Sequence, residues 1–153
     1  MKIRFEIIIT ALIGFGAIYM NCNPSNKMIK DSADATTLVK APLQETHWTL
    51  VELMGKPVTD TPERKEMYLI LHKDQNRVEG NGGCNAFSGT YVLKNNEISF
   101  GPLVSTKVFC PALTYENEFF KALSTANHYY LKSDTLSLTK GKIMRVAKFI
   151  AKQ

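Results

Sequence analysis

The residue best suited to catalytic chemistry is Cys84, which lies inside the glycine-rich stretch of residues 80–91. A cysteine acts as a nucleophile only when its pKa is lowered and a base lies beside it. His47, His72 or His128 would have to supply that base. No string typical of a cysteine-enzyme family surrounds Cys84, so a small thiol-dependent or hydrolytic periplasmic enzyme is the alternative hypothesis and not the leading one.

Other site chemistry has weaker support in the sequence. Zinc-type Cys-x-x-Cys or His-x-x-x-His pairs are absent, and the glycine stretch lacks the residue order of a phosphate-binding loop. Glu116 and Glu118 fall at the beginning of an expected helix, where carboxylates interact favourably with the helix dipole. We therefore interpret them as helix-start residues, and we expect no metal, no cofactor and no catalytic residue.

The N-terminus has the layout of a secretory signal. Lys2 and Arg4 precede an uncharged run over residues 7–20, which is shorter than the about 20 apolar residues of a membrane-spanning helix. Cys22 follows directly, as the acylated cysteine does in the lipobox of bacterial lipoproteins, although residues 19–21 differ from the usual lipobox residues. We expect a lipoprotein-type signal peptide over residues 1–21, a lipid on Cys22, a flexible tether over 22–41 and one folded domain over 42–153.

Export and anchoring decide the expected compartment and partners. The residues after Cys22 lack the aspartate that marks inner-membrane retention in some bacteria, which favours the periplasmic side of the outer membrane. In an oxidising compartment two well-separated cysteines usually pair, so we favour a Cys84–Cys110 disulfide over a buried free pair or a catalytic thiol. The net charge of +5 is a mild excess, and neither it nor the compartment supports nucleic-acid binding.

Hydrophobic patterns predict a mostly antiparallel β domain with one helix. Four of the nine glycines fall within residues 80–91, which predicts a tight corner between strands. Apolar residues recur at helical spacing over 114–126, so this helix is amphipathic. Basic side chains without an acid follow Thr139, and we expect them to protect an edge strand, with contact to anionic lipid headgroups as the alternative. The expected strands are 47–53, 67–72, 90–93, 97–100, 103–109, 129–131, 136–138 and 143–150, and the expected buried helix face is Tyr115, Phe119, Ala122, Leu123 and Ala126.

Motif residues recur along most of the domain and together form one pattern. The pattern consists of three strings and continues through Ser105–Cys110, Glu118, Leu123 and Leu136-x-Leu138. The strings are Trp48-x-Leu50-x-x-Leu53-x-Gly55, Leu69-x-Leu71 and Gly80-x-x-Gly83-Cys84-Asn85-x-Phe87-x-Gly89-x-Tyr91. The pattern resembles the META domain, the HslJ-like family of small bacterial envelope proteins. The resemblance implies an α+β fold, a curved antiparallel sheet or partial barrel with one packed amphipathic helix. It also implies no established enzymatic activity, and structural roles for Trp48, Gly83, Asn85, Gly89 and Tyr91.

These features together predict a lipid-anchored accessory protein of the cell envelope. We expect its domain to act as a binding or structural module in envelope homeostasis or stress tolerance, and a periplasmic inhibitor or chaperone-like role is a further alternative that the sequence does not separate from it. The expected partners are the membrane, through the N-terminal lipid, and an unidentified envelope protein. We expect the protein to be a monomer that does not bind nucleic acid.

Overall fold

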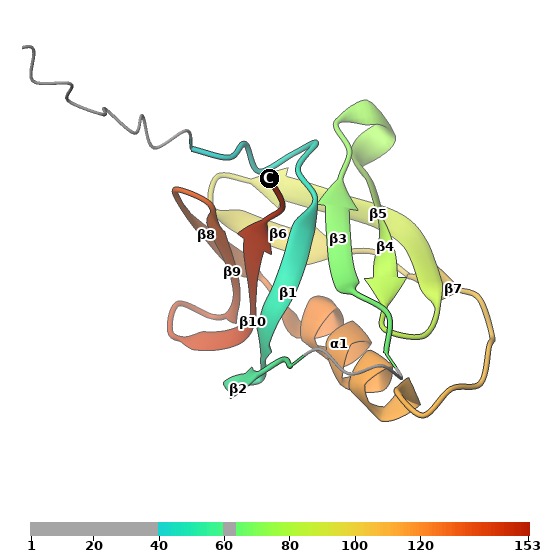
Figure 1. Cartoon of the computed structure of the whole chain (residues 1–153). Helices are drawn as coiled ribbons and strands as arrows, with labels where there is room; N and C mark the ends of the chain where they lie inside the picture. Colours follow the sequence, from blue (N-terminus) through green and yellow to red (C-terminus); the bar gives the residue numbers. More distant parts are fainter. Residues whose placement is uncertain (1–39, 60–63) are drawn as a thin grey trace, which may run out of the picture. The chain divides into compact units, whose positions relative to one another are not determined.

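The chain forms a β-barrel with one helix in the computed structural model, which describes residues 40–59 and 64–153 (Figure 1). The expected signal peptide, Cys22 and nearly all of the expected tether lie outside these residues. The helix is α1 (Leu113–Thr125), and η1 (Asp74–Asn76) is a short 3-10 turn. The strands are β1 (Trp48–Leu53), β2 (Lys56–Pro57), β3 (Met67–Leu71), β4 (Arg77–Gly82), β5 (Ala86–Lys94), β6 (Glu97–Phe100), β7 (Val104–Ser105), β8 (His128–Lys132), β9 (Thr135–Lys140) and β10 (Met144–Ala151).

The barrel closes because β10 pairs with β9 on one side and with β1 on the other. The strand order β10-β9-β8-β6-β5-β4-β3-β1 is antiparallel throughout, which confirms the expected fold class and extends the partial barrel to a closed one. Since β10 has a partner on both sides, the explanation of the basic side chains after Thr139 as protection of an edge strand is wrong. Arg145 instead binds Glu52, with 2.8 Å between Nε and Oε1.

The closed sheet has its shortest strand pairing at the junction of β6 and β8, where only Glu97 and His128 are in register. Two further backbone bonds, from Ile98 N to Asn127 O and from Tyr129 N to Asn96 O, complete this junction. The segment of chain that joins these two neighbouring strands contains β7 and α1. The β6–β8 junction is therefore the place where the additional elements leave the barrel and return to it.

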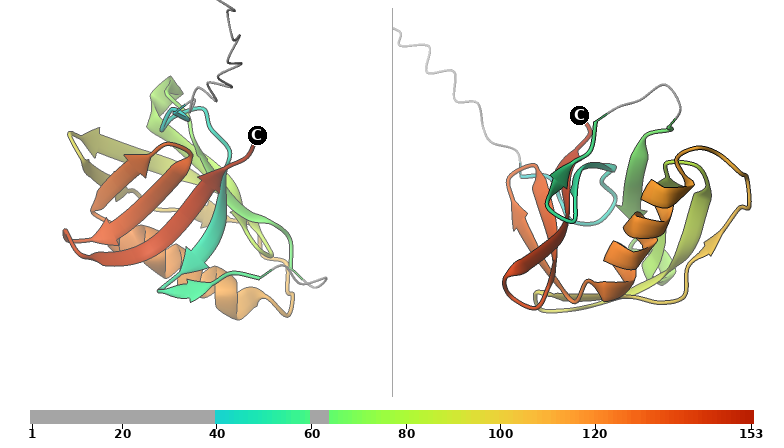
Figure 2. Two further views of the ribbon diagram at one scale, coloured as in Figure 1. Left: turned by 60° about the vertical axis from the view of Figure 1, so that its left-hand side comes forward. Right: turned by 90° about the horizontal axis from the view of Figure 1, so that it is seen from below.

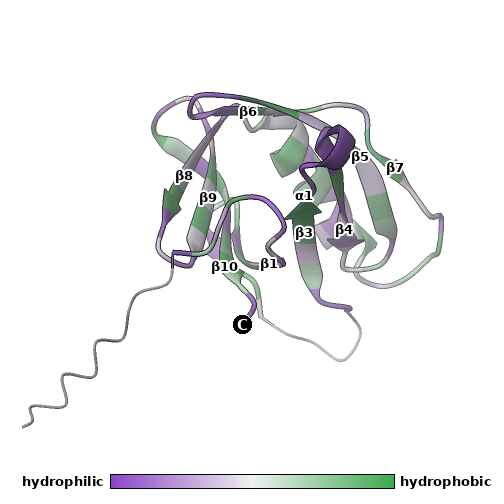
Figure 3. Ribbon diagram, turned by 90° about the horizontal axis from the view of Figure 1, so that it is seen from above, coloured by the Kyte–Doolittle hydropathy of each residue, from purple (hydrophilic) through white to green (hydrophobic). Residues whose placement is uncertain are grey.

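The core is built by strands that bury every second side chain. In β3, Met67, Leu69 and Leu71 are buried while Tyr68 and Ile70 are only half-buried, so every second side chain of this strand enters the core. Viewed from above, much of β3 and β10 is hydrophobic and η1 is hydrophilic (Figure 3). The largest fully buried side chains are Trp48, Tyr91, Phe119, Phe149, Leu69, Leu71, Ile98, Leu123, Leu136, Leu138, Val78 and Val146.

Helix α1 packs against strands from both sides of the barrel, namely β10, β4, β6, β1 and β9 (Figure 2). Phe119, Ala122 and Leu123 are fully buried, as the helical spacing predicts. Tyr115, expected on the same face, is 50% exposed, and the Arg64 guanidinium lies 5.1 Å from its ring centre. The buried position in the first turn belongs to Glu116, which shares the packed face because it lies three positions before Phe119 and seven before Leu123. None of the described helices is long and apolar enough to cross a membrane.

A polar cluster ties the C-terminus to the outside of β1 and β3. Burial acts to raise the pKa of Glu66, but hydrogen bonds from Lys152 and Thr49 and the charge of His47 outweigh it and lower the pKa from 4.5 to about 2. Lys152 Nζ lies 2.9 Å from Oε2 of Glu66, and Thr49 Oγ1 lies 2.7 Å from Oε1. His47 also stacks on the ring of Tyr68. The charged form of Glu66 is therefore favoured by folding.

Glu66 should contribute to stability in a pH-dependent way. Because its pKa is lower in the folded state than in the unfolded state, its contribution is present above the unfolded value and disappears as the pH falls toward about 2. At neutral pH Glu66→Gln should unfold at a lower urea concentration than the wild type, and the two midpoints should converge in acid. Glu118→Gln, on the exposed surface of α1, is the control and should change neither midpoint. A midpoint difference for Glu66→Gln that is independent of pH would contradict this assignment.

Candidate functional site

The turn between β4 and β5 is the centre of the candidate site. Only Gly83, Cys84 and Asn85 lie outside the two strands, so the corner expected over residues 80–91 is real but much narrower. Gly83 has φ +102°, a backbone conformation that residues with a side chain rarely adopt. Its N–H donates to Asn81 Oδ1 at 2.8 Å. The turn therefore depends on glycine at position 83.

Two further glycines leave room for parts of the chain that pack on this hairpin. A Cβ atom at Gly82 would lie 2.7 Å from Cγ of Glu116, and one at Gly89 would lie 2.7 Å from Cδ2 of Leu103. Contacts this short are not tolerated, so both positions require glycine unless their neighbours move. The density of glycine in this stretch thus reflects close packing of α1 and of the chain after β6 on the β4–β5 hairpin.

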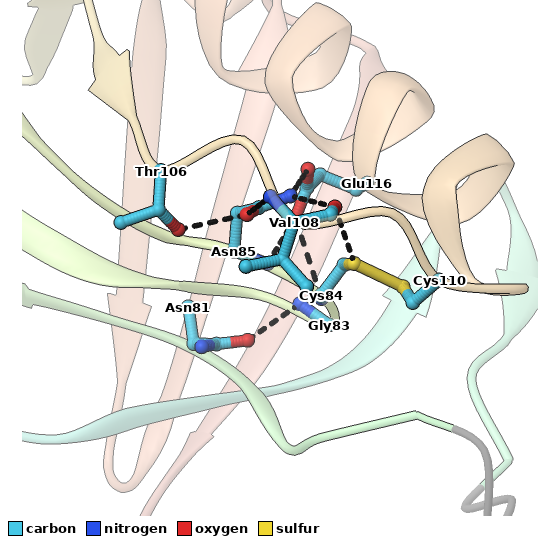
Figure 4. The surroundings of a disulfide bond; sticks show 8 residues. All are labelled: Asn81, Gly83, Cys84, Asn85, Thr106, Val108, Cys110 and Glu116. Atoms are coloured by element: carbon cyan, nitrogen blue, oxygen red, sulfur yellow. Dashed lines mark hydrogen bonds between the residues drawn. A yellow bond between two sulfur atoms is a disulfide. The ribbon is translucent and has the colours of Figure 1, made fainter.

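Glu116 and Asn85 form a buried pair at the turn, and each is only 2% exposed (Figure 4). Oε2 of Glu116 accepts hydrogen bonds from the backbone N–H of Asn85 at 2.6 Å and of Cys84 at 3.3 Å. Oε1 accepts from Nδ2 of Asn85 at 2.8 Å. A buried carboxylate is tolerated only when such donors replace water. Our interpretation of Glu116 as a helix-start residue therefore missed its main role, which is to attach α1 to the turn.

Asn85 also fastens the segment 101–112, which we call the strap. Its Oδ1 accepts from Thr106 Oγ1 and from Val108 N, both at 2.7 Å, and its Nδ2 donates to Val108 O at 3.1 Å. The amide side chain thus takes the place of a strand partner for Val108. For this reason β7 covers only Val104–Ser105, where a strand over 103–109 was expected.

The structure joins Cys84 and Cys110 by a disulfide, with 6.1 Å between their Cα atoms. This bond attaches the end of the strap, just before α1, to the β4–β5 turn (Figure 4). Cys84 is 5% exposed, and its Sγ lies 3.2 Å from Val108 O. The strap is therefore held by a covalent bond and by the Asn85 side chain at neighbouring positions.

The histidines contact other groups. His47 contacts Glu66, His72 lies 3.0 Å from both Glu45 and Glu79, and His128 contacts Asn127. The groups around Cys84 are instead Glu116, Val108 and Asn85, as described above. Among residues 40–59 and 64–153, no group of three His, Cys, Asp or Glu side chains is placed to hold a metal ion.

Trp48 and Tyr91 lie away from the turn and hold the segment that precedes β1. The indole Nε1 of Trp48 donates to Leu43 O at 2.9 Å. The hydroxyl of Tyr91 donates to His72 O at 3.0 Å and accepts from Nε2 of Gln44. Of the five motif residues, Gly83, Asn85 and Gly89 are therefore gathered at the hairpin, while Trp48 and Tyr91 fix the entry of the chain into the barrel.

A groove runs between the strap and α1. It consists of two hollows of about 380 and 350 Å³ that share Ser105 and Phe120. One hollow is lined further by Phe100, Leu103 and Lys121, and the other by Val108, Phe109, Leu113, Asn117 and Lys107. Phe109 at its margin is 88% exposed. This elongated, mostly apolar surface is suited to binding and lies directly beside the Asn85–Glu116 pair.

Removal of either cysteine of the disulfide should destabilise the domain by the same amount. The bond spans 26 positions, which corresponds to about 3–4 kcal/mol in the chain-entropy estimate. Cys84→Ala and Cys110→Ala should lower the free energy of unfolding by similar amounts, and the double variant should resemble either single one, because one bond is lost in each case. Denaturant unfolding checks this, with mass spectrometry of unreduced protein to verify the bond. A large loss for one variant beside a negligible loss for the other would contradict it.

The buried pair should show strong coupling. Asn85→Ala leaves the Val108 backbone groups and Oε1 of Glu116 without their partner, although Oε2 keeps its two backbone donors. Glu116→Ala leaves three N–H donors unpaired. Each loss should cost about 2 kcal/mol or more, since a buried polar group left unpaired costs about 1–3 kcal/mol. In a double-mutant cycle the double variant should lose less than the sum of the singles. Asn117→Ala, on the exposed surface one position after Glu116, is the matched control and should stay within about 0.5 kcal/mol of the wild type. Strict additivity would mean that the two side chains act independently.

Comparison with known proteins matches this geometry to known folds. An NMR structure of a protein from Burkholderia xenovorans is 23% identical, with 72% of this chain and 84% of that chain covered and a TM-score of 0.59. A crystal structure of a DUF4847 family protein from Bacteroides vulgatus is 18% identical, with 71% and 93% covered and a TM-score of 0.52. At such identities the likeness concerns the fold alone. No curated protein matches the chain.

The family is given by the sequence itself. The pattern of the META domain matches residues 41–153, which contain all of the described strands, the helix, the disulfide and the Asn85–Glu116 pair. The chain belongs to the META domain family.

Proposed function

We propose that the protein is an exported, lipid-anchored protein of the cell envelope whose META domain acts as a binding module in envelope homeostasis or stress tolerance. The observation that carries this proposal is the Cys84–Cys110 disulfide, which fastens the strap beside an open groove. A stable structural disulfide suits an oxidising compartment, to which the signal-like N-terminus would direct the chain.

Binding agrees better with the geometry than thiol chemistry does. A nucleophilic cysteine needs a free thiolate with a base beside it, whereas Cys84 is bonded to Cys110 and its neighbours are backbone groups and Glu116. The groove offers apolar surface with a few polar groups, which is the usual composition of a binding site. The enzyme hypothesis requires a reduced Cys84 in the native envelope, and alkylation of the protein taken from that compartment would detect it.

The anchoring part of the proposal depends on Cys22. Two or more acyl chains give stable membrane attachment where a single chain does not. The wild-type chain should incorporate labelled fatty acid and fractionate with membranes, and Cys22→Ala should do neither. Cys110→Ala is the control for a cysteine that carries no lipid, and it should be labelled like the wild type. Equal labelling of the wild type and Cys22→Ala would refute the anchor.

A further inference from the structure

We propose that the groove between the strap and α1 binds an extended, acidic segment of a partner protein, which adds as a strand to the outer edge of β7. This inference rests on the proposed binding function and gives it a partner class. It depends on two observations, the unpaired edge of β7 and the arrangement of apolar and basic side chains along the groove.

The first observation is the orientation of the β7 backbone. Within the described part of the chain β7 pairs with β5 alone, with Ser105 opposite Phe87. The backbone N–H of Thr106 donates to Ala86 O on β5. Donors in an antiparallel pair alternate between the two sides of a strand, so the N–H and C=O of Ser105 point away from β5. Ser105 lines both hollows of the groove, and its outward N–H and C=O groups are therefore available to hydrogen-bond a ligand in the groove.

The second observation is the chemistry of the groove. Phe120 and Leu103 are half-buried and supply an apolar floor, while Lys107 and Lys121 are exposed at the two hollows. Glu116, the acidic side chain that lines the groove, already accepts three hydrogen bonds from the turn. The remaining charge at the groove is positive, so an acidic segment with apolar side chains complements it.

The free edge favours a peptide over a fatty acyl chain as the occupant. A strand edge presents alternating donors and acceptors, and an added peptide strand satisfies both kinds while its alternate side chains enter the groove. An acyl chain would leave these backbone groups unpaired. The strap is also fixed in advance by the disulfide and by Asn85, which lowers the entropic cost of ordering it on binding.

The test uses a dye-labelled, capped peptide in which valine and glutamate alternate, and fluorescence anisotropy with the full chain isolated from the cell fraction that contains it. Ser105→Pro removes the outward N–H without removing a bond to β5, so it should weaken binding about tenfold and leave the melting temperature unchanged. Thr106→Pro removes the backbone bond to Ala86 together with the hydroxyl bond to Asn85, so it should lower the melting temperature more than Thr106→Val, which loses the hydroxyl bond alone. This comparison checks the register independently. Lys107→Glu should weaken binding about fivefold, while Lys132→Glu, exposed on β8, should not.

Two altered probes separate strand addition from simple filling of the groove. The same peptide with N-methyl groups on alternate residues, and its lysine-containing counterpart, should both bind much more weakly than the original. Sodium palmitate should not displace the peptide. The proposal is overturned if the peptide does not bind at millimolar concentration, if N-methylation or Ser105→Pro leaves binding unchanged, or if palmitate displaces it. None of these readouts depends on Cys22, so a failure here leaves the anchoring proposal standing, and a failure of fatty-acid labelling leaves the groove to be judged by itself.

Discussion

The structure depends on one buried carboxylate. Glu116 occupies a position in α1 that would otherwise hold an apolar residue, and it is tolerated because the backbone of the β4–β5 turn and the amide of Asn85 donate to it. A turn of different conformation would not present these N–H groups together. The left-handed Gly83 and the small Gly82 are therefore conditions for the same interaction, since one shapes the turn and the other gives the carboxylate its space. Helix, turn and strap acquire their relative positions from this contact.

The barrel and the site play different roles in the domain. Eight strands close a circuit around an apolar core and form the scaffold on which the turn and the strap are placed. The Asn85–Glu116 pair and the disulfide add little apolar contact to that core. They determine instead where the strap runs, and hence the shape of the groove that it forms with α1. Of the five pattern residues, Gly83, Asn85 and Gly89 thus specify the position of one surface segment on the barrel.

Much of the fold was predictable from the sequence, because period-two alternation and the Phe119–Leu123 spacing are local signals that the structure follows. The closed barrel was not, since the pairing of β1 with β10 joins the two ends of the domain and leaves no local pattern. The short β7 was missed because a side chain, Asn85, replaces the ladder. A signal for Glu116 was present: it lies three positions before Phe119 and seven before Leu123, so helical spacing places it on the buried face. Its charge favoured a surface position, and only the donors of a distant turn reverse that preference.

The narrow β6–β8 junction has a consequence for how this fold diversifies. Because the two strands meet at a single register position, most register positions of each are shared with its other neighbour, four between β6 and β5 and five between β8 and β9. The strap and α1 are inserted where the hydrogen-bond ladder between neighbouring strands, β6 and β8, is shortest. An insertion at such a point can lengthen, shorten or be exchanged between relatives while the remaining strands keep their registers. Because α1 also supplies Phe119 and Leu123 to the barrel core, any exchange of this segment would have to keep these apolar side chains together with the β4–β5 turn that binds Glu116.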